Sequence, residues 1–141
     1  MTSVRASVLG FALLALACGT RDVSPIDPTI GTIPPDTVSL RVGQTVRAGV
    51  ADITFTAVPE DGRCPSDVVC IWAGNAVAEL TVGPAVGEGP TFRLLLNTTL
   101  DPREGEAWGL RLTLVDLAPL PVSTRATQPQ DYLLRLGVSV R

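Results

Sequence analysis

Apolar and polar residues alternate with period two along most of the chain beyond residue 36. The plainest example lies around Leu80, where Ala76, Ala78, Leu80 and Val82 occupy every second position. Successive side chains of a β-strand lie on opposite faces, so this alternation predicts half-buried strands that share one core. The same pattern occurs over residues 37–42, 52–57, 92–96, 108–114 and 131–140.

Turn-forming residues separate these stretches, because the chain holds 13 glycines and 12 prolines among 141 residues. Roughly six to eight short strands joined by turns are typical of a sandwich or a small barrel. We expect residues 37–141 to form one all-β domain, a single small antiparallel β-sandwich that is immunoglobulin-like or related.

Five aromatic side chains fall in the predicted strands, and we expect them in the core rather than in a sugar-stacking platform. They are Phe55, Trp72, Phe92, Trp108 and Tyr132.

The N-terminus has the features of an export signal. Arg5 provides a positive charge, and residues 8–17 form an apolar run about half as long as a membrane-spanning helix needs. The sequence LLALAC at residues 13–18 resembles the bacterial lipobox. This resemblance implies that residues 1–17 are a lipoprotein signal peptide and that Cys18 becomes lipidated after cleavage.

The lipobox resemblance also implies a location. Acyl chains on Cys18 would anchor the protein in a membrane of the cell envelope. Gly19, where an aspartate commonly signals inner-membrane retention, favours the outer membrane if the cell is Gram-negative. Residues 18–36 contain four prolines and are expected to form an extended, proline-rich tether between the lipidated cysteine and the domain.

The chain has three cysteines, an odd number for an exported protein. Assigning Cys18 to lipid leaves Cys64 and Cys70, and an oxidising compartment favours a disulfide between them. Three other interpretations stay open at this point. They are a redox pair, a soft-metal site and a calcium site that uses Glu60, Asp61 and Asp67.

Residues 60–76 read EDGRCPSDVVCIWAGNA, and the pattern RCP-x4-C-x-WAG within them is the most distinctive in the chain. The segment resembles one found in uncharacterised bacterial secreted proteins and lipoproteins. That resemblance supports the Cys64–Cys70 disulfide and implies no catalytic residue. We expect Ile71 and Trp72 to begin a strand directly after the second cysteine.

Composition excludes several functions. The chain has no histidine, which excludes Ser-His-Asp and Cys-His catalytic sets and histidine-ligated metals. It has no lysine and a net charge of −3, so it lacks the cationic face that nucleic acids require. We therefore expect no catalytic residues, no metal and no cofactor, and a protein that is not an enzyme.

The remaining hypothesis is a lipid-anchored binding or structural module with a protein partner in the envelope. Its displayed feature would be the loop around the two cysteines, with Asp61, Arg63 and Asp67 as candidate contacts. One alternative is a protease-inhibitor-like sandwich, because VGQTV at residues 42–46 resembles the opening strand of chagasin-type inhibitors, although their NPTTG-like loop is missing. Calcium binding and an enzyme that uses two carboxylates are further alternatives.

Overall fold

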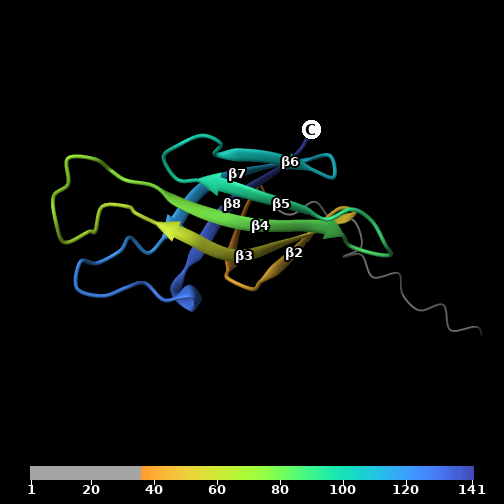
Figure 1. Cartoon of the computed structure of the whole chain (residues 1–141). Helices are drawn as coiled ribbons and strands as arrows, with labels where there is room; N and C mark the ends of the chain where they lie inside the picture. Colours follow the sequence, from red (N-terminus) through yellow and green to blue (C-terminus); the bar gives the residue numbers. More distant parts are fainter. Residues whose placement is uncertain (1–35) are drawn as a thin grey trace, which may run out of the picture.

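Two antiparallel four-stranded sheets pack face to face in the computed structural model, which describes residues 36–141 (Figure 1). The first sheet has the spatial order β1 (Thr37–Arg41), β8 (Leu133–Val140), β7 (Leu110–Ala118) and β6 (Glu104–Ala107). The second has the order β2 (Thr45–Ala48), β3 (Ala51–Asp61), β4 (Ala76–Pro84) and β5 (Phe92–Asn97). The predicted all-β sandwich is confirmed. The predicted signal peptide, Cys18 and nearly all of the tether lie outside the described residues.

The connections follow a simple meander. Strands β2 to β5 are hydrogen-bonded neighbours in chain order, as are β6 to β8, and β1 then pairs with β8. Immunoglobulin sandwiches instead use Greek-key connections. The strand order of this domain therefore differs from that of an immunoglobulin sandwich.

The core lies between the sheets and is built from the alternating residues. All four apolar positions of the Leu80 segment are fully buried in β4, and Leu110, Leu112 and Leu114 are buried in β7. Alternate side chains of a strand share one face, which explains why the period-two pattern identified these residues. One 3-10 helix, η1 (Pro129–Asp131), precedes β8, and residues 36–141 include no helix long and apolar enough to cross a membrane.

The expected burial of the aromatic residues is correct only in part. Phe55 and Tyr132 are buried and Trp108 packs against the core. Phe92 is 43% exposed, because it lies at the start of the edge strand β5, where few side chains cover it. Trp72 is 81% exposed and lies in no strand, so its predicted place in the core is wrong.

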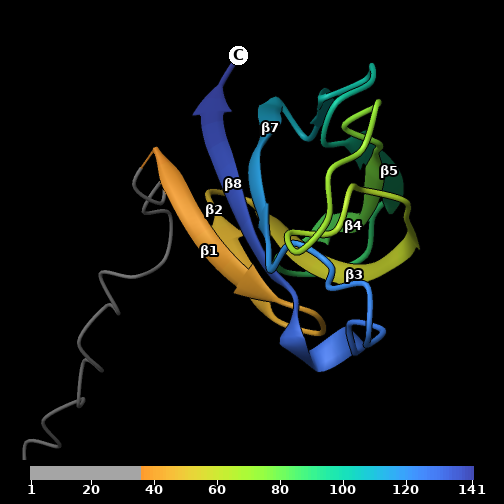
Figure 2. The same ribbon diagram turned by 90° about the vertical axis from the view of Figure 1, so that its left-hand side faces the viewer.

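The sandwich has two ends with different roles. At one end, β3 leads into residues 62–75 and β7 leads into residues 119–132, and we call this the loop end. The chain enters β1 at Thr37, which pairs with Gly137 near the far end of β8, so it enters at the opposite or entry end. Figure 1 shows the two long loops extending together from one end, and Figure 2 views the molecule along that direction.

Candidate functional site

The connection between β3 and β4, residues 62–75, continues the strand pairing beyond the sheet. The Gly62 amide donates to the Asn75 carbonyl at 2.8 Å, and the Cys64 amide donates to the Ala73 carbonyl at the same distance. The two arms of the loop therefore leave the sandwich as a short hydrogen-bonded ladder. We refer to residues 62–75 as the cysteine loop.

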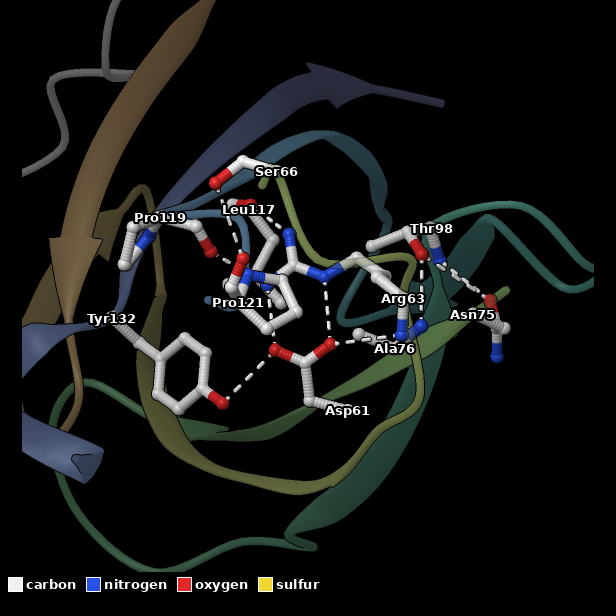
Figure 3. Close-up of polar contacts among 10 residues, drawn as sticks. All are labelled: Asp61, Arg63, Ser66, Asn75, Ala76, Thr98, Leu117, Pro119, Pro121 and Tyr132. Atoms are coloured by element: carbon white, nitrogen blue, oxygen red, sulfur yellow. Dashed lines mark hydrogen bonds and ion pairs between the residues drawn. The ribbon is translucent and has the colours of Figure 1, made fainter. Parts of the chain in front are cut away.

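A buried ion pair lies at the base of the cysteine loop (Figure 3). The Arg63 guanidinium donates from Nε to Asp61 Oδ1 at 2.8 Å and from Nη2 to Asp61 Oδ2 at 2.7 Å. The two side chains are 7% and 8% exposed. Two parallel charge-assisted hydrogen bonds fix both the distance and the orientation of the pair.

The same arginine connects the two sheets. Arg63 Nη1 donates to the Leu117 carbonyl at the end of β7, and Nη2 donates to the Pro119 carbonyl at 2.7 Å. The Tyr132 hydroxyl, next to β8, donates to Asp61 Oδ2 at 3.0 Å. One network thus joins the end of β3 to both strands β7 and β8.

The structure places two of the candidate contact residues inside the domain. The side chains of Asp61 and Arg63 are almost fully buried, and their polar groups bind each other and neighbouring groups of the domain. The physical reason is that a buried charge needs a hydrogen-bonded partner, and each supplies that partner for the other. Through these contacts Asp61 and Arg63 attach the base of the cysteine loop to the domain.

The electrostatics of the pair favour the charged form of Asp61. Burial raises the pKa of its carboxyl, but the hydrogen bonds and positive charge of Arg63 and the Tyr132 hydroxyl outweigh burial and lower the pKa overall. Burial, followed by the hydrogen bond to Asp61, raises the pKa of Tyr132. Both shifts favour the same protonation states, a charged Asp61 carboxylate and a protonated Tyr132 phenol.

A second attachment lies on the other side of the loop base. Asn75 Oδ1 accepts hydrogen bonds from the backbone amides of Thr98 and Thr99, each at 3.1 Å. Its Nδ2 donates to Asn97 Oδ1 at 2.7 Å. No local pattern in the sequence identifies Asn75 as this link, because its partners lie 22 to 24 residues away.

Beyond the base, the disulfide closes the loop as predicted. The Cα atoms of Cys64 and Cys70 lie 5.9 Å apart. Residues between them are attached to the β7–β8 connection. The Ser66 amide donates to the Pro121 carbonyl at 2.8 Å, and Asp67 accepts from the Ser123 amide at 2.8 Å and from its hydroxyl at 2.5 Å. Asp67, the third candidate contact, is exposed.

The tip of the cysteine loop is apolar and faces solvent. The exposed fractions are 45% for Val68, 102% for Val69, 92% for Ile71 and 81% for Trp72. We call these four residues the apolar tip. Ile71 and Trp72 do not begin a strand, because the ladder ends at Ala73 and β4 starts only at Ala76.

This geometry gives little support to calcium binding or to a protease-inhibitor-like sandwich. Both Asp61 oxygens are bound by Arg63 or Tyr132, and both Asp67 oxygens by Ser123, so these acids do not converge on a calcium site. For the protease-inhibitor-like alternative, residues 42–44 form the turn from β1 to β2 instead of an opening strand.

A cavity of about 210 Å³ lies beside the loop base, lined in part by Arg63, Gly74 and Leu120.

No family model, curated protein or solved structure matches the chain.

Proposed function

We propose that this protein is a lipid-anchored binding module of the cell envelope that contacts its partner through the cysteine loop. One observation carries the proposal: four large apolar side chains are displayed on a loop that the domain holds at several points. Contiguous apolar groups on a surface commonly mark an interaction site, whereas single exposed ones need no explanation.

The attachments of the loop support binding over a purely structural role. The disulfide, the Arg63 network, Asn75 and Asp67 each fix a different part of residues 62–75. A loop that is already ordered loses less conformational entropy on binding, so more of the contact energy appears as affinity. Tryptophan is also enriched among residues that dominate interface energies.

The anchoring part of the proposal comes from the sequence. In this scheme residues 1–17 are removed as a signal peptide, Cys18 carries the acyl chains and residues 18–36 are the tether to a membrane of the cell envelope, which is the outer membrane if the cell is Gram-negative. The chain enters the domain at the end opposite the cysteine loop, which suits display away from the attachment point (Figure 1). The module has no catalytic role and no nucleic-acid partner in this proposal.

Photo-crosslinking in intact cells tests the binding role. A benzoylphenylalanine replaces Ile71 in the tip, and the control replaces Val86, which is 80% exposed in the β4–β5 connection at the entry end. We expect an adduct from position 71 and none from position 86. No adduct from position 71, or equal adducts from both, would contradict the proposal.

The anchoring role has a separate test. The intact mass of the protein purified from membranes should correspond to a chain that starts at Cys18 and carries acyl chains, with two hydrogens fewer for the Cys64–Cys70 disulfide. A full-length chain with three free thiols would contradict the anchor.

A further inference from the structure

We infer that the apolar tip seats in an apolar cleft of another protein, and that the rim of this cleft carries a basic or hydrogen-bond-donating group opposite Asp67. This inference rests on the proposed binding function and names its partner class. Three features of the described residues support it: the shape of the tip, its charge and its position relative to the tether.

The shape of the tip favours a concave partner. Val69, Ile71 and Trp72 are almost fully exposed, and the loop that carries them extends beyond the ends of β3 and β4 (Figure 1). Such a projection buries its side chains only when the opposing surface surrounds it, as at hot spots where a large side chain fills a desolvated pocket. A flat surface would leave much of each side chain in water.

The charge of the loop disfavours a lipid bilayer as the partner. Envelope membranes rich in anionic lipids attract basic side chains. Within residues 62–75 the only exposed charged residue is Asp67, since Arg63 is buried in its ion pair. The hydrogen bonds from Ser123 lower the pKa of Asp67, so its negative charge persists. The Asp67 carboxylate disfavours contact of this loop with an anionic membrane surface, whereas a basic group on a protein rim would attract it.

The position of the tip also favours a protein partner over the membrane that holds the anchor. The tether joins the domain before Thr37, at the entry end, and the tip lies at the loop end. A domain extended on its tether therefore directs the tip away from the membrane that holds the anchor. A protein on the side of the domain away from the anchoring membrane can contact the tip without any reorientation of the domain.

A second copy of this chain fits less well. A two-fold contact through the tip would bring together the same surface of both copies. The two projections would then meet each other, and the Asp67 carboxylates beside them would lie at one interface with like charge. Both effects oppose a symmetric dimer.

The test uses benzoylphenylalanine at position 72 of the full chain, expressed and irradiated in its own cells, with adducts identified by mass spectrometry. The inference expects one protein adduct whose crosslinked peptide is rich in apolar residues. It also expects Val69→Asp to reduce the yield about ten-fold or more, because a charge would enter an apolar cleft without a partner. The matched control Val86→Asp should leave the yield unchanged, and both variants should keep the unfolding midpoint of the parent protein.

The outcomes separate the two levels of the proposal. A lipid adduct, or an adduct between two copies of this chain, would overturn the inferred partner class and leave a binding function standing. A protein adduct that Val69→Asp leaves at full yield would also overturn the inference. No adduct at position 72, in a protein that is folded and anchored, would overturn the binding function itself.

Discussion

The Asp61 carboxylate and the Arg63 guanidinium, two residues apart in the chain, form a two-bond ion pair that is buried where β3 becomes the cysteine loop. The same guanidinium reaches the carbonyl of Leu117 in β7, on the other sheet, and that of Pro119 just after this strand. The direction in which the loop leaves the domain is therefore set by contacts with both sheets. The pair links the fold of the sandwich to the display of the apolar tip.

Replacing Arg63 by methionine should destabilise the domain strongly. The substitution leaves Asp61 buried without its counter-charge and removes a donor from two carbonyls, and loss of one partner of a buried pair typically costs about 3–5 kcal/mol. Urea unfolding followed by circular dichroism measures the loss. The matched control is Arg111→Met, which breaks a half-exposed pair with Glu106 and should cost about 0–1 kcal/mol. Equal losses in the two variants would show that Arg63 is not buried in solution.

The network should also make stability depend on pH at both extremes. The pKa of Asp61 is lower in the folded state, so its stabilisation is present above about pH 4 and is lost as the pH falls through the folded pKa. The pKa of Tyr132 is raised by burial and by Asp61, so its stabilisation is present below about pH 10 and is lost as the pH rises through the folded value. Urea midpoints measured across the pH range should be flat between these limits.

The alkaline decline can be assigned to one residue. The chain has a single tyrosine and no lysine, and Cys64 and Cys70 are paired, so within residues 36–141 Tyr132 is the one side chain other than arginine that titrates in the alkaline range. Tyr132→Phe should therefore abolish the alkaline decline and keep the acid one. An alkaline decline of the same size in this variant would assign it to another group.

The sequence predicts the strands better than the site. In β4 every second residue is apolar, and a half-buried strand buries every second residue, so the pattern alone identifies the core face. The disulfide was predictable as well, because the sequence predicts an exported chain, and an oxidising compartment favours pairing of Cys64 with Cys70. Both predictions depend on local order in the sequence.

The buried network and the exposed tip could not be predicted from local sequence. The partners of Asp61 and Arg63 are distant in the chain. The Tyr132 hydroxyl lies 71 residues from Asp61, and the Leu117 carbonyl lies 54 residues from Arg63, so no local pattern indicates that these charges are buried. Trp72 was expected in the core because large aromatic side chains usually are buried. The ladder between the two arms of the loop extends only as far as Ala73, and the Trp72 side chain beyond it is 81% exposed.

The base of the cysteine loop should not accept a side chain at Gly74. Its φ is +71°, and a Cβ atom there would lie 2.0 Å from the Gly62 carbonyl oxygen. Gly74→Ala should therefore break the pairing of the two arms and cost more than the roughly 1–2 kcal/mol of the left-handed conformation alone. Gly87→Ala is the control, because its φ is +76° and no atom lies within 4 Å of the added Cβ. Similar unfolding free energies for both variants would argue against the close approach.

Removing the disulfide should loosen the loop while the sandwich stays folded. Cys64→Ser together with Cys70→Ser opens a short closed loop, for which the chain-entropy estimate is about 2 kcal/mol. The core residues lie in the strands, so circular dichroism should keep its β-sheet form. Backbone order parameters from NMR should fall at residues 66–72 and stay high in β4. Unchanged order parameters at the tip would mean that the contacts with Pro121 and Ser123 suffice to hold it.

The apolar tip should be dispensable for folding, which separates binding from stability. Trp72→Ala removes the largest side chain of the tip, but that side chain is 81% exposed and buries little area, so the unfolding free energy should change by less than about 0.5 kcal/mol. Phe55→Ala in the core is the contrasting variant and should cost about 3–5 kcal/mol. Circular dichroism is the probe for both, because tryptophan fluorescence changes with the substitution itself. A loss above about 1 kcal/mol for Trp72→Ala would mean that Trp72 packs against the domain in solution and is not displayed.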